Sequence, residues 1–191
     1  MENRSLCLLA GALLAAASAL GQEQDRAERV ATARAAAKDL GTALRRELQT
    51  SVEAGGAVAA LDVCKTRAPA LAAERSRGRP FQIGRTSLRV RNPSNAPDEW
   101  ERKTLTLFES RKAKGEDPAR MEHYEVVTQS SGRRWFRYLK PIVTEPMCLR
   151  CHADALEKDV AARLRVLYPD DRAMGFKTGD IRGAFTFRQP L

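Results

Sequence analysis

The sequence has no second long hydrophobic run after residue 20, and it has no internal repeat or low-complexity linker. These absences argue against a second membrane span and against a repeat architecture. About 170 residues follow the first 21, enough for one domain with a hydrophobic core. We therefore expect a single domain over residues 22–191.

Aromatic side chains are scarce, at 6% of the chain, although the formal net charge is +9. Proteins that bind single-stranded nucleic acid combine cations with aromatic rings that stack on bases, and the basic residues here lack such neighbours. Nucleic acid is therefore not an expected partner. A solvated surface explains the charge, and so does docking to an acidic partner protein or an anionic membrane face.

Residues 1–21 have the form of a secretory signal peptide. Arg4 precedes an apolar run over residues 6–20, and small residues near its end offer a cleavage site. The run is too short for a comfortable membrane span. We therefore expect export to the periplasm, loss of Cys7 with the signal peptide, and no membrane span in the mature chain.

The chain has only two histidines and four cysteines, and three of these residues lie in the run Cys148-Leu149-Arg150-Cys151-His152. Cys-x-x-Cys-His is the attachment motif for c-type haem. Two thiols at this spacing reach the two vinyl groups of a porphyrin, and the histidine that follows offers a nitrogen to iron. The motif predicts one covalent haem c, tethered by Cys148 and Cys151, with His152 as the proximal axial ligand.

Two other readings of these residues remain open. Cys148 and Cys151 with Cys64 and His123 make a plausible Cys₃His set for zinc. A disulfide between Cys148 and Cys151 is the third alternative, because the chain is expected to be exported. The surrounding residues do not resemble the strand and helix context of a thioredoxin.

Cys64 is left over once the haem motif has taken two of the three cysteines expected in the mature chain. An unpaired cysteine in an oxidising compartment is a buried spectator, an intermolecular bridge or a ligand. Lys65 and Arg67 lie beside it, and nearby cations favour the thiolate, which is the form that binds metal.

Hydrophobic periodicity predicts an α+β fold, because helices come first and a mostly antiparallel sheet follows. Trp100, Thr104, Leu107 and Phe108 are expected to share one face of a helix, and Gly55 and Gly56 to break another helix. The expected helices cover residues 25–53, 58–64, 70–76, 98–112 and 153–167, and the expected strands cover residues 81–91, 122–128, 134–143 and 183–188.

Several separated motifs resemble the c-type haem-binding PAS-like domain family, long catalogued as a domain of unknown function. The likeness extends over about residues 25–190. The motifs are Leu-Asp-Val-Cys at 61–64, Ala-Pro at 68–69, Gly-Arg-Thr-Ser-Leu-Arg-Val-Arg-Asn-Pro-Ser-Asn-Ala-Pro at 84–97, Asp-Glu-Trp-Glu at 98–101, Cys-Leu-Arg-Cys-His at 148–152, Tyr-Pro-Asp-Asp-Arg-Ala-Met-Gly at 168–175 and Gly-Asp-Ile-Arg-Gly at 179–183. The chain looks like a free-standing periplasmic member.

The resemblance implies a PAS-like antiparallel sheet with a long N-terminal helix and one covalent haem c. It implies His152 on one side of the iron and Cys64 as the distal axial ligand, with His123, Met174 and Met121 as competitors for that position. Arg85 and Arg91 are candidates for contacts with the haem propionates, although turn formation and core packing explain these two residues as well.

A thiolate opposite an imidazole stabilises Fe(III), so we expect a low-potential cytochrome. Iron with two protein ligands has no open position for a substrate, which argues against an enzyme. Two functions are expected: one-electron transfer with a redox partner protein, or redox sensing. A sensor of NO or CO that signals through a separate partner is the alternative, and a zinc-binding structural domain is a further one.

Overall fold

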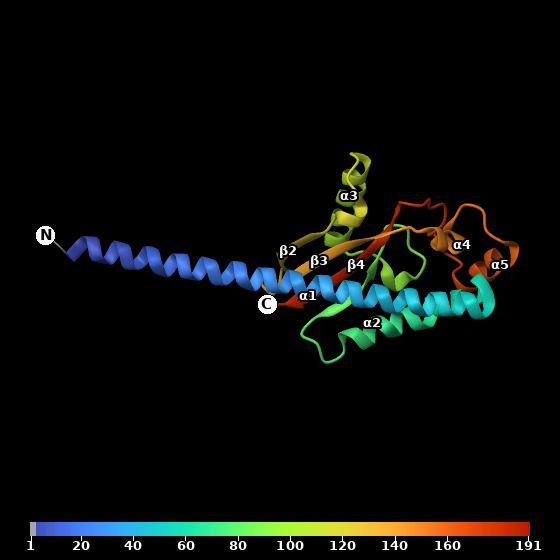
Figure 1. The fold of residues 1–191 in the computed structure, drawn as a ribbon, viewed down its shortest axis with the longest axis horizontal. Helices are drawn as coiled ribbons and strands as arrows, with labels where there is room; N and C mark the ends of the chain where they lie inside the picture. Colours follow the sequence, from blue (N-terminus) through green and yellow to red (C-terminus); the bar gives the residue numbers. More distant parts are fainter. Residues whose placement is uncertain (1–2) are drawn as a thin grey trace.

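The structure is a computed structural model that describes residues 3–191, with side chains described from residue 21. Helix α1 (Asn3–Asp62) lies along a four-stranded sheet, beyond which its N-terminal part extends (Figure 1). The strands are β1 (Gln82–Thr86), β2 (His123–Thr128), β3 (Arg134–Val143) and β4 (Ile181–Pro190), in the order β1-β4-β3-β2, and all neighbours are antiparallel. The predicted α+β fold with an antiparallel sheet and a long N-terminal helix is confirmed.

One face of the sheet packs against α1 and α2 (Ala68–Ser76). Alanines on α1 let the helix approach the large aromatic side chains of β3 and β4 closely. At Gly41 an added Cβ would lie 2.9 Å from the ring of Phe185, so the contact leaves no room for a side chain. The buried residues of this core are Val30, Ala33, Ala37, Leu40, Ala43, Leu71, Ile83, Phe136, Tyr138 and Phe187.

The opposite face of the sheet packs against α3 (Glu99–Ala113). Side chains of β3 alternate between the two faces, because Tyr138 points to the α1 core and Leu139 to the α3 core. The molecule therefore has a sheet between two helical layers. The predicted buried face of α3 is wrong at one position, since Leu105 is buried and Leu107 is 42% exposed.

The chain reverses direction at Gly55 and Gly56, where α1 is interrupted as predicted. Gly56 has φ = 71°, a left-handed conformation that favours glycine. After residues 57–62 no loop separates α1 from α2. The two helices are joined by a π-helical turn, η1 (Val63–Arg67). The sequence predicted the helix that carries Cys64, but it did not predict this turn.

Two predicted elements have the wrong extent. The helix expected at 153–167 begins only at Lys158, as α5 (Lys158–Leu167), and a separate short helix, α4 (Leu149–His152), comes before it. α4 ends because the His152 carbonyl accepts from the Phe176 amide at 2.9 Å and Ala153 is extended, with ψ = 171°. β1 ends at Thr86 rather than near residue 91, because the Ser87 amide donates to the Asn95 carbonyl at 3.2 Å.

None of the helices in the part of the chain that the structure describes combines the length and apolar character that a bilayer crossing needs.

Replacing Gly183 with alanine is expected to lower the free energy of unfolding by about 1–3 kcal/mol. A Cβ at Gly183 would lie 2.4 Å from the carbonyl oxygen of Thr86, so β1 and β4 would have to separate. Urea unfolding of the purified protein measures the effect. Gly84→Ala is the matched control in the paired strand, because its Cβ would meet Thr186 at an ordinary 3.7 Å. Equal losses in both variants would contradict the close approach as the cause.

Candidate functional site

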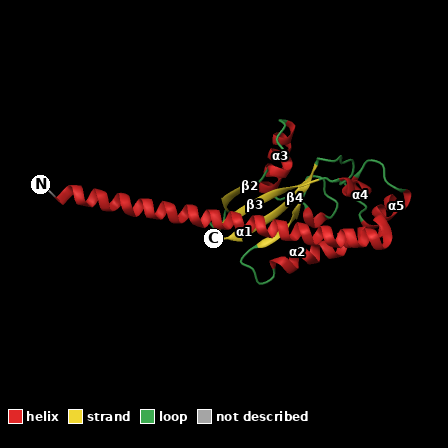
Figure 2. Cartoon of the chain, in the orientation of Figure 1, coloured by secondary structure: helices red, strands yellow, loops and turns green. Residues whose placement is uncertain are grey.

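The Cys-x-x-Cys-His motif lies at one end of the sheet, where α4 and α5 face the end of α1 (Figures 1 and 2). Cys148 ends a short 3-10 turn, η4 (Pro146–Cys148), and α4 carries Cys151 and His152. The turn is held to α1 through Glu145, whose carboxylate accepts from Arg45 Nη1 at 2.5 Å. The loop that carries both motif cysteines is thereby fixed against the long helix.

The His152 ring has a fixed orientation and a fixed tautomer. Its Nδ1 lies 2.7 Å from the carbonyl oxygen of Ala173, so Nδ1 carries the proton and donates it. Nε2 then keeps a free lone pair, which accepts from Arg182 Nε at 3.3 Å. Burial, with Arg182 and Arg91 nearby, lowers the pKa of His152 well below its usual value. The imidazole is therefore neutral, as a metal ligand must be.

Cys64 and His152 share two charged neighbours. Arg182 and Arg85 both lower the pKa of the His152 imidazole, and the Cys64 sulfur lies near both guanidinium groups. Burial raises the pKa of the Cys151 thiol to about 11, and the neighbouring Cys64 and Cys148 sulfurs contribute. The structure therefore brings all four predicted residues of the haem site together, including the one that lies 84 positions before Cys148 in the chain.

The other predicted ligands lie elsewhere, with one exception. His123 is on β2, 6.0 Å between ring centroids from Trp100, and Met121 is buried in the α3 core. Met174 packs in the same cluster as Cys151 and stays a competitor of Cys64. The Cys₃His zinc set is not assembled, and among the described residues no three His, Cys, Asp or Glu side chains are placed to hold a metal. Cys64, Cys148 and Cys151 are free thiols, so the alternative disulfide is not formed.

Arg91 is buried and holds the motif rather than facing open space. Its Nε donates to Asp171 Oδ2 at 2.9 Å, and its Nη2 donates to the carbonyl oxygens of Cys151 at 2.6 Å and Ala173 at 3.2 Å. The same Ala173 carbonyl accepts from His152. Arg91 therefore joins the segment after β1, the motif and the loop after α5.

Replacing Arg91 with methionine is expected to lower the free energy of unfolding by about 3–5 kcal/mol. The substitution would leave the buried Asp171 carboxylate without its cation and two carbonyls without a donor. Urea unfolding measures the loss. Arg133→Met in the exposed hairpin turn is the control and should change stability by less than about 0.5 kcal/mol. A loss of unfolding free energy in Arg91→Met no larger than in the control would contradict the structural role of Arg91.

Arg182 and Phe176 also belong to the site, although no sequence pattern indicated a role for either residue. Phe176 lies edge-on to His152, with 6.0 Å between ring centroids, and the guanidinium of Arg182 lies 5.3 Å from the Phe176 centroid. Arg85, on β1, is half-buried beside Cys64. The sequence feature that could have indicated Arg182 is its place in the Gly-Asp-Ile-Arg-Gly motif at 179–183, one of the motifs that carry the family resemblance.

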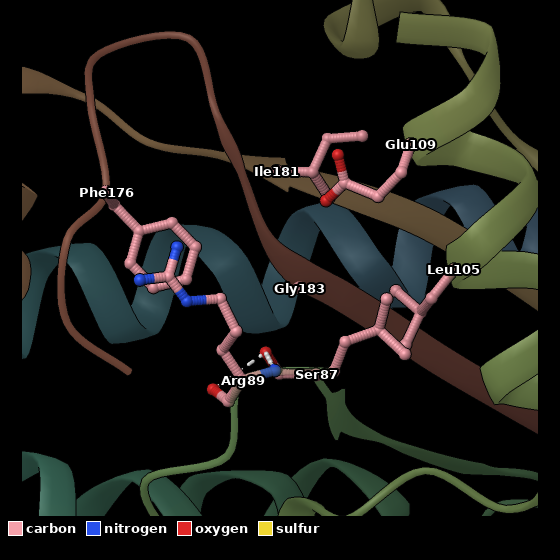
Figure 3. A pocket seen from close by; sticks show the side chains of 8 residues that line it. Ser87, Arg89, Leu105, Glu109, Phe176, Ile181 and Gly183 are labelled. Carbon is pink, nitrogen blue, oxygen red and sulfur yellow. Dashed lines mark hydrogen bonds between the residues drawn. The ribbon is translucent and has the colours of Figure 1, made fainter. Parts of the chain in front are cut away.

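A small pocket lies behind Phe176, on the side of α3. Arg89 stacks on the Phe176 ring there, 4.0 Å from its centroid (Figure 3). With Arg182, two guanidinium groups lie close to one ring. Burial raises the pKa of Glu109, which points into this pocket from α3. The lining residues are Ser87, Leu88, Arg89, Leu105, Glu109, Phe176, Ile181 and Gly183.

The donor set of the site fits a c-type haem. Cys148 and Cys151 supply thiols for the tether, His152 supplies an unprotonated Nε2, and Cys64 supplies a second soft or anionic ligand. Arg85 and Arg182 add positive charge without a carboxylate partner among the described residues. This charge suits a cofactor that carries two carboxylates.

Comparisons with known proteins point to one family. A family model described as "Tll0287-like: Tll0287" matches residues 16–190. A solved structure described as the crystal structure of the cyanobacterial heme-protein Tll0287 is similar to this chain, with a TM-score of 0.62 and 24% sequence identity. The match covers 86% of this chain and 96% of that one. No curated protein matches. The structural likeness confirms the fold.

Proposed function

The chain belongs to the Tll0287-like family, and from this premise we propose that it is a periplasmic cytochrome that binds one haem c covalently. The observation that carries the proposal is the His152 ring, whose Nδ1 is held by the Ala173 carbonyl while the lone pair of Nε2 meets only a long contact of 3.3 Å from Arg182 Nε. The description of the similar structure as a heme-protein supports it. Each thiol of Cys148 and Cys151 would add across a vinyl group, so that sulfur bonds to one carbon and hydrogen to the other.

His152 and Cys64 are the proposed axial ligands. Both lie near Arg182 and Arg85, and Cys64 is half-buried, so a ligand between them would be screened from bulk water. When bound, haem supplies one iron that accepts and releases a single electron. Two protein ligands would leave no position for a substrate, so we propose no enzymatic turnover.

One-electron transfer with an acidic redox partner is the role that this arrangement supports best. The formal net charge of the whole chain is +9, although the end that carries the motif exposes acidic as well as basic side chains. The net positive charge would speed association with an acidic protein and would make the rate fall as salt is added. Export to the periplasm rests on the signal-peptide pattern of residues 1–21.

Redox or gas sensing is the second candidate, and the π-helical turn η1 favours it. π-Helical turns occur mostly as single turns and often at functional sites, and this turn carries Cys64. The same turn continues directly from α1, so release of the Cys64 sulfur from iron would change the position of the long helix. NO or CO would then be the expected gas ligand, and a separate protein would receive the signal.

The visible spectrum of the purified protein, oxidised and reduced, with a pyridine haemochrome assay, tests the proposed function. The protein should be expressed in a host that has cytochrome c maturation. We expect a low-spin spectrum and a haemochrome band typical of two thioether bonds. A colourless product would contradict haem binding and would return the motif to a metal or disulfide role.

Exposure of the reduced protein to CO separates the two roles. An electron carrier should keep both ligands and show no CO spectrum, whereas a gas sensor should bind CO readily and lose its thiolate spectrum. Fast electron exchange with an acidic redox protein, such as a plant-type ferredoxin, together with CO resistance would favour transfer.

A further inference from the structure

We infer that Arg182 and Arg85 form the carboxylate-binding pair of the site and hold the two haem propionates, whereas Arg91 positions the motif. This inference rests on the proposed function. It reassigns one of the two arginines expected from the sequence, and it adds Arg182.

The hydrogen bonds of the three arginines differ in kind. Arg91 already donates to a carboxylate and to two carbonyls. Arg182 donates only to weaker partners, His152 Nε2 at 3.3 Å and Ser87 Oγ at 3.2 Å. Arg85 has no hydrogen bond or ion pair among the described residues. The charge of Arg91 is therefore matched by Asp171, although its buried Nη1 has no hydrogen bond, whereas Arg182 and Arg85 have no carboxylate partner among the described residues.

Arg182 and Arg85 are half-buried and lie near each other without a counter-charge. This arrangement is unfavourable, because the two positive charges repel each other and neither is fully solvated. Burial and the two neighbouring arginines lower the pKa of Arg182 to about 10, which agrees with this crowding. Two ionised carboxylates would match the two groups in number and sign. Guanidinium binds carboxylate through two parallel hydrogen bonds, so the pair suits this ligand better than it suits a simple anion.

Arg182 also occupies the lone pair that a metal on His152 would need. Nε2 accepts either from Arg182 or from a metal, because it has a single lone pair. Metal binding would therefore free Arg182 Nε at the moment when a carboxylate arrives. Arg182 would have to swing away from Nε2 to make room for the metal, and its contacts with Ser87 Oγ and the Phe176 ring would keep the freed guanidinium at this side of the site.

Titration with free haem and with haem dimethyl ester tests the inference, because esterification removes only the carboxylate charges. The full chain carrying Cys148→Ala and Cys151→Ala allows reversible binding. In this background we expect haem to bind at least about tenfold more tightly than the ester. Arg182→Gln and Arg85→Gln should each reduce this preference several-fold, and Arg182→Lys should retain part of it.

Arg89→Gln is the matched control, because Arg89 stacks on the same Phe176 ring but is exposed. It should leave the preference unchanged. Equal affinities for haem and ester would overturn the inference and leave the proposed function standing. Failure to bind either compound would instead contradict the proposed function. A loss of preference at Arg89 as large as that at Arg182 would overturn the assignment.

A second measurement uses the covalently loaded protein and does not require the cysteine variants to fold. Carboxylates held by guanidinium groups stay ionised at mildly acidic pH, so the midpoint potential should change little between about pH 5 and 8. Arg182→Gln should introduce a pH-dependent potential in this range. An equally flat profile in Arg182→Gln would overturn the inference.

Discussion

Replacing both Cys148 and Cys151 with alanine is expected to abolish covalent haem attachment completely. The structure holds the two thiols in one short loop, which Arg45 fixes through Glu145 and Arg91 fixes through the Cys151 carbonyl. Each single alanine variant would keep one thiol and one covalent bond. Acidified organic solvent extracts only haem that is not covalently bound, so extraction followed by mass spectrometry of the protein measures the outcome.

The mass should fall by one haem in the double variant, and the pyridine haemochrome band should shift in the single variants. Cys64→Ala is the control for general loss of thiol chemistry, because Cys64 lies on η1 and should take no part in attachment. Haem that stays on the double variant after extraction would contradict the assignment of the tethers. Loss of attachment in Cys64→Ala would contradict the separation of the tethering and ligating cysteines.

The residues that carry the chemistry could be predicted because their types and spacing are local. The five residues from Cys148 to His152 indicate a haem-attachment motif by themselves. Cys64 became a candidate ligand because it is the one cysteine of the expected mature chain outside that motif. Arg182 could not be assigned in this way. Its place beside His152 depends on the loop after α5 and on the pairing of β4, which bring together residues 30 positions apart.

The predicted bounds and buried faces of the helices were wrong where tertiary contacts override hydrophobic periodicity. Residues 153–157 have no helix breaker of their own, yet α4 ends because the Phe176 amide takes the His152 carbonyl. The π-helical turn at Cys64 likewise leaves no mark on hydrophobic periodicity, because it shifts the pattern by a single residue. On α3, Leu105 and Leu107 are equally apolar, and only the position of the sheet decides which one is buried.

Arg91 and Arg85 show a second limit of sequence reasoning. Both were expected as propionate contacts, since both are cations near the haem motif in the resemblance. The structure pairs Arg91 with Asp171, Cys151 and Ala173 and leaves its buried Nη1 without a hydrogen bond, while Arg85 has no such partner among the described residues. Whether a cation is structural or available therefore depends on partners that lie 60 to 82 positions away in the chain.

Replacing Cys64 with alanine is expected to raise the midpoint potential by on the order of 0.1 V or more, within the roughly 0.8 V over which axial ligands set haem potentials. A thiolate donates negative charge to iron and favours Fe(III), so its loss favours Fe(II). The oxidised spectrum should also lose its low-spin form or change to that of another ligand. Potentiometric titration followed by visible spectroscopy, with electron paramagnetic resonance of the oxidised protein, measures both effects.

Met174→Leu is the decisive control, because Met174 is the competing ligand that the structure places in the same cluster as Cys151. Its sulfur lies 3.7 Å from Arg91 Nη2, which already gives it a partner within the protein. The leucine variant should keep the potential and spectrum of the parent protein, whereas Cys64→Ala should change both. The reverse result would move the sixth ligand from η1 to the loop after α5, and with it the reason to expect a low potential.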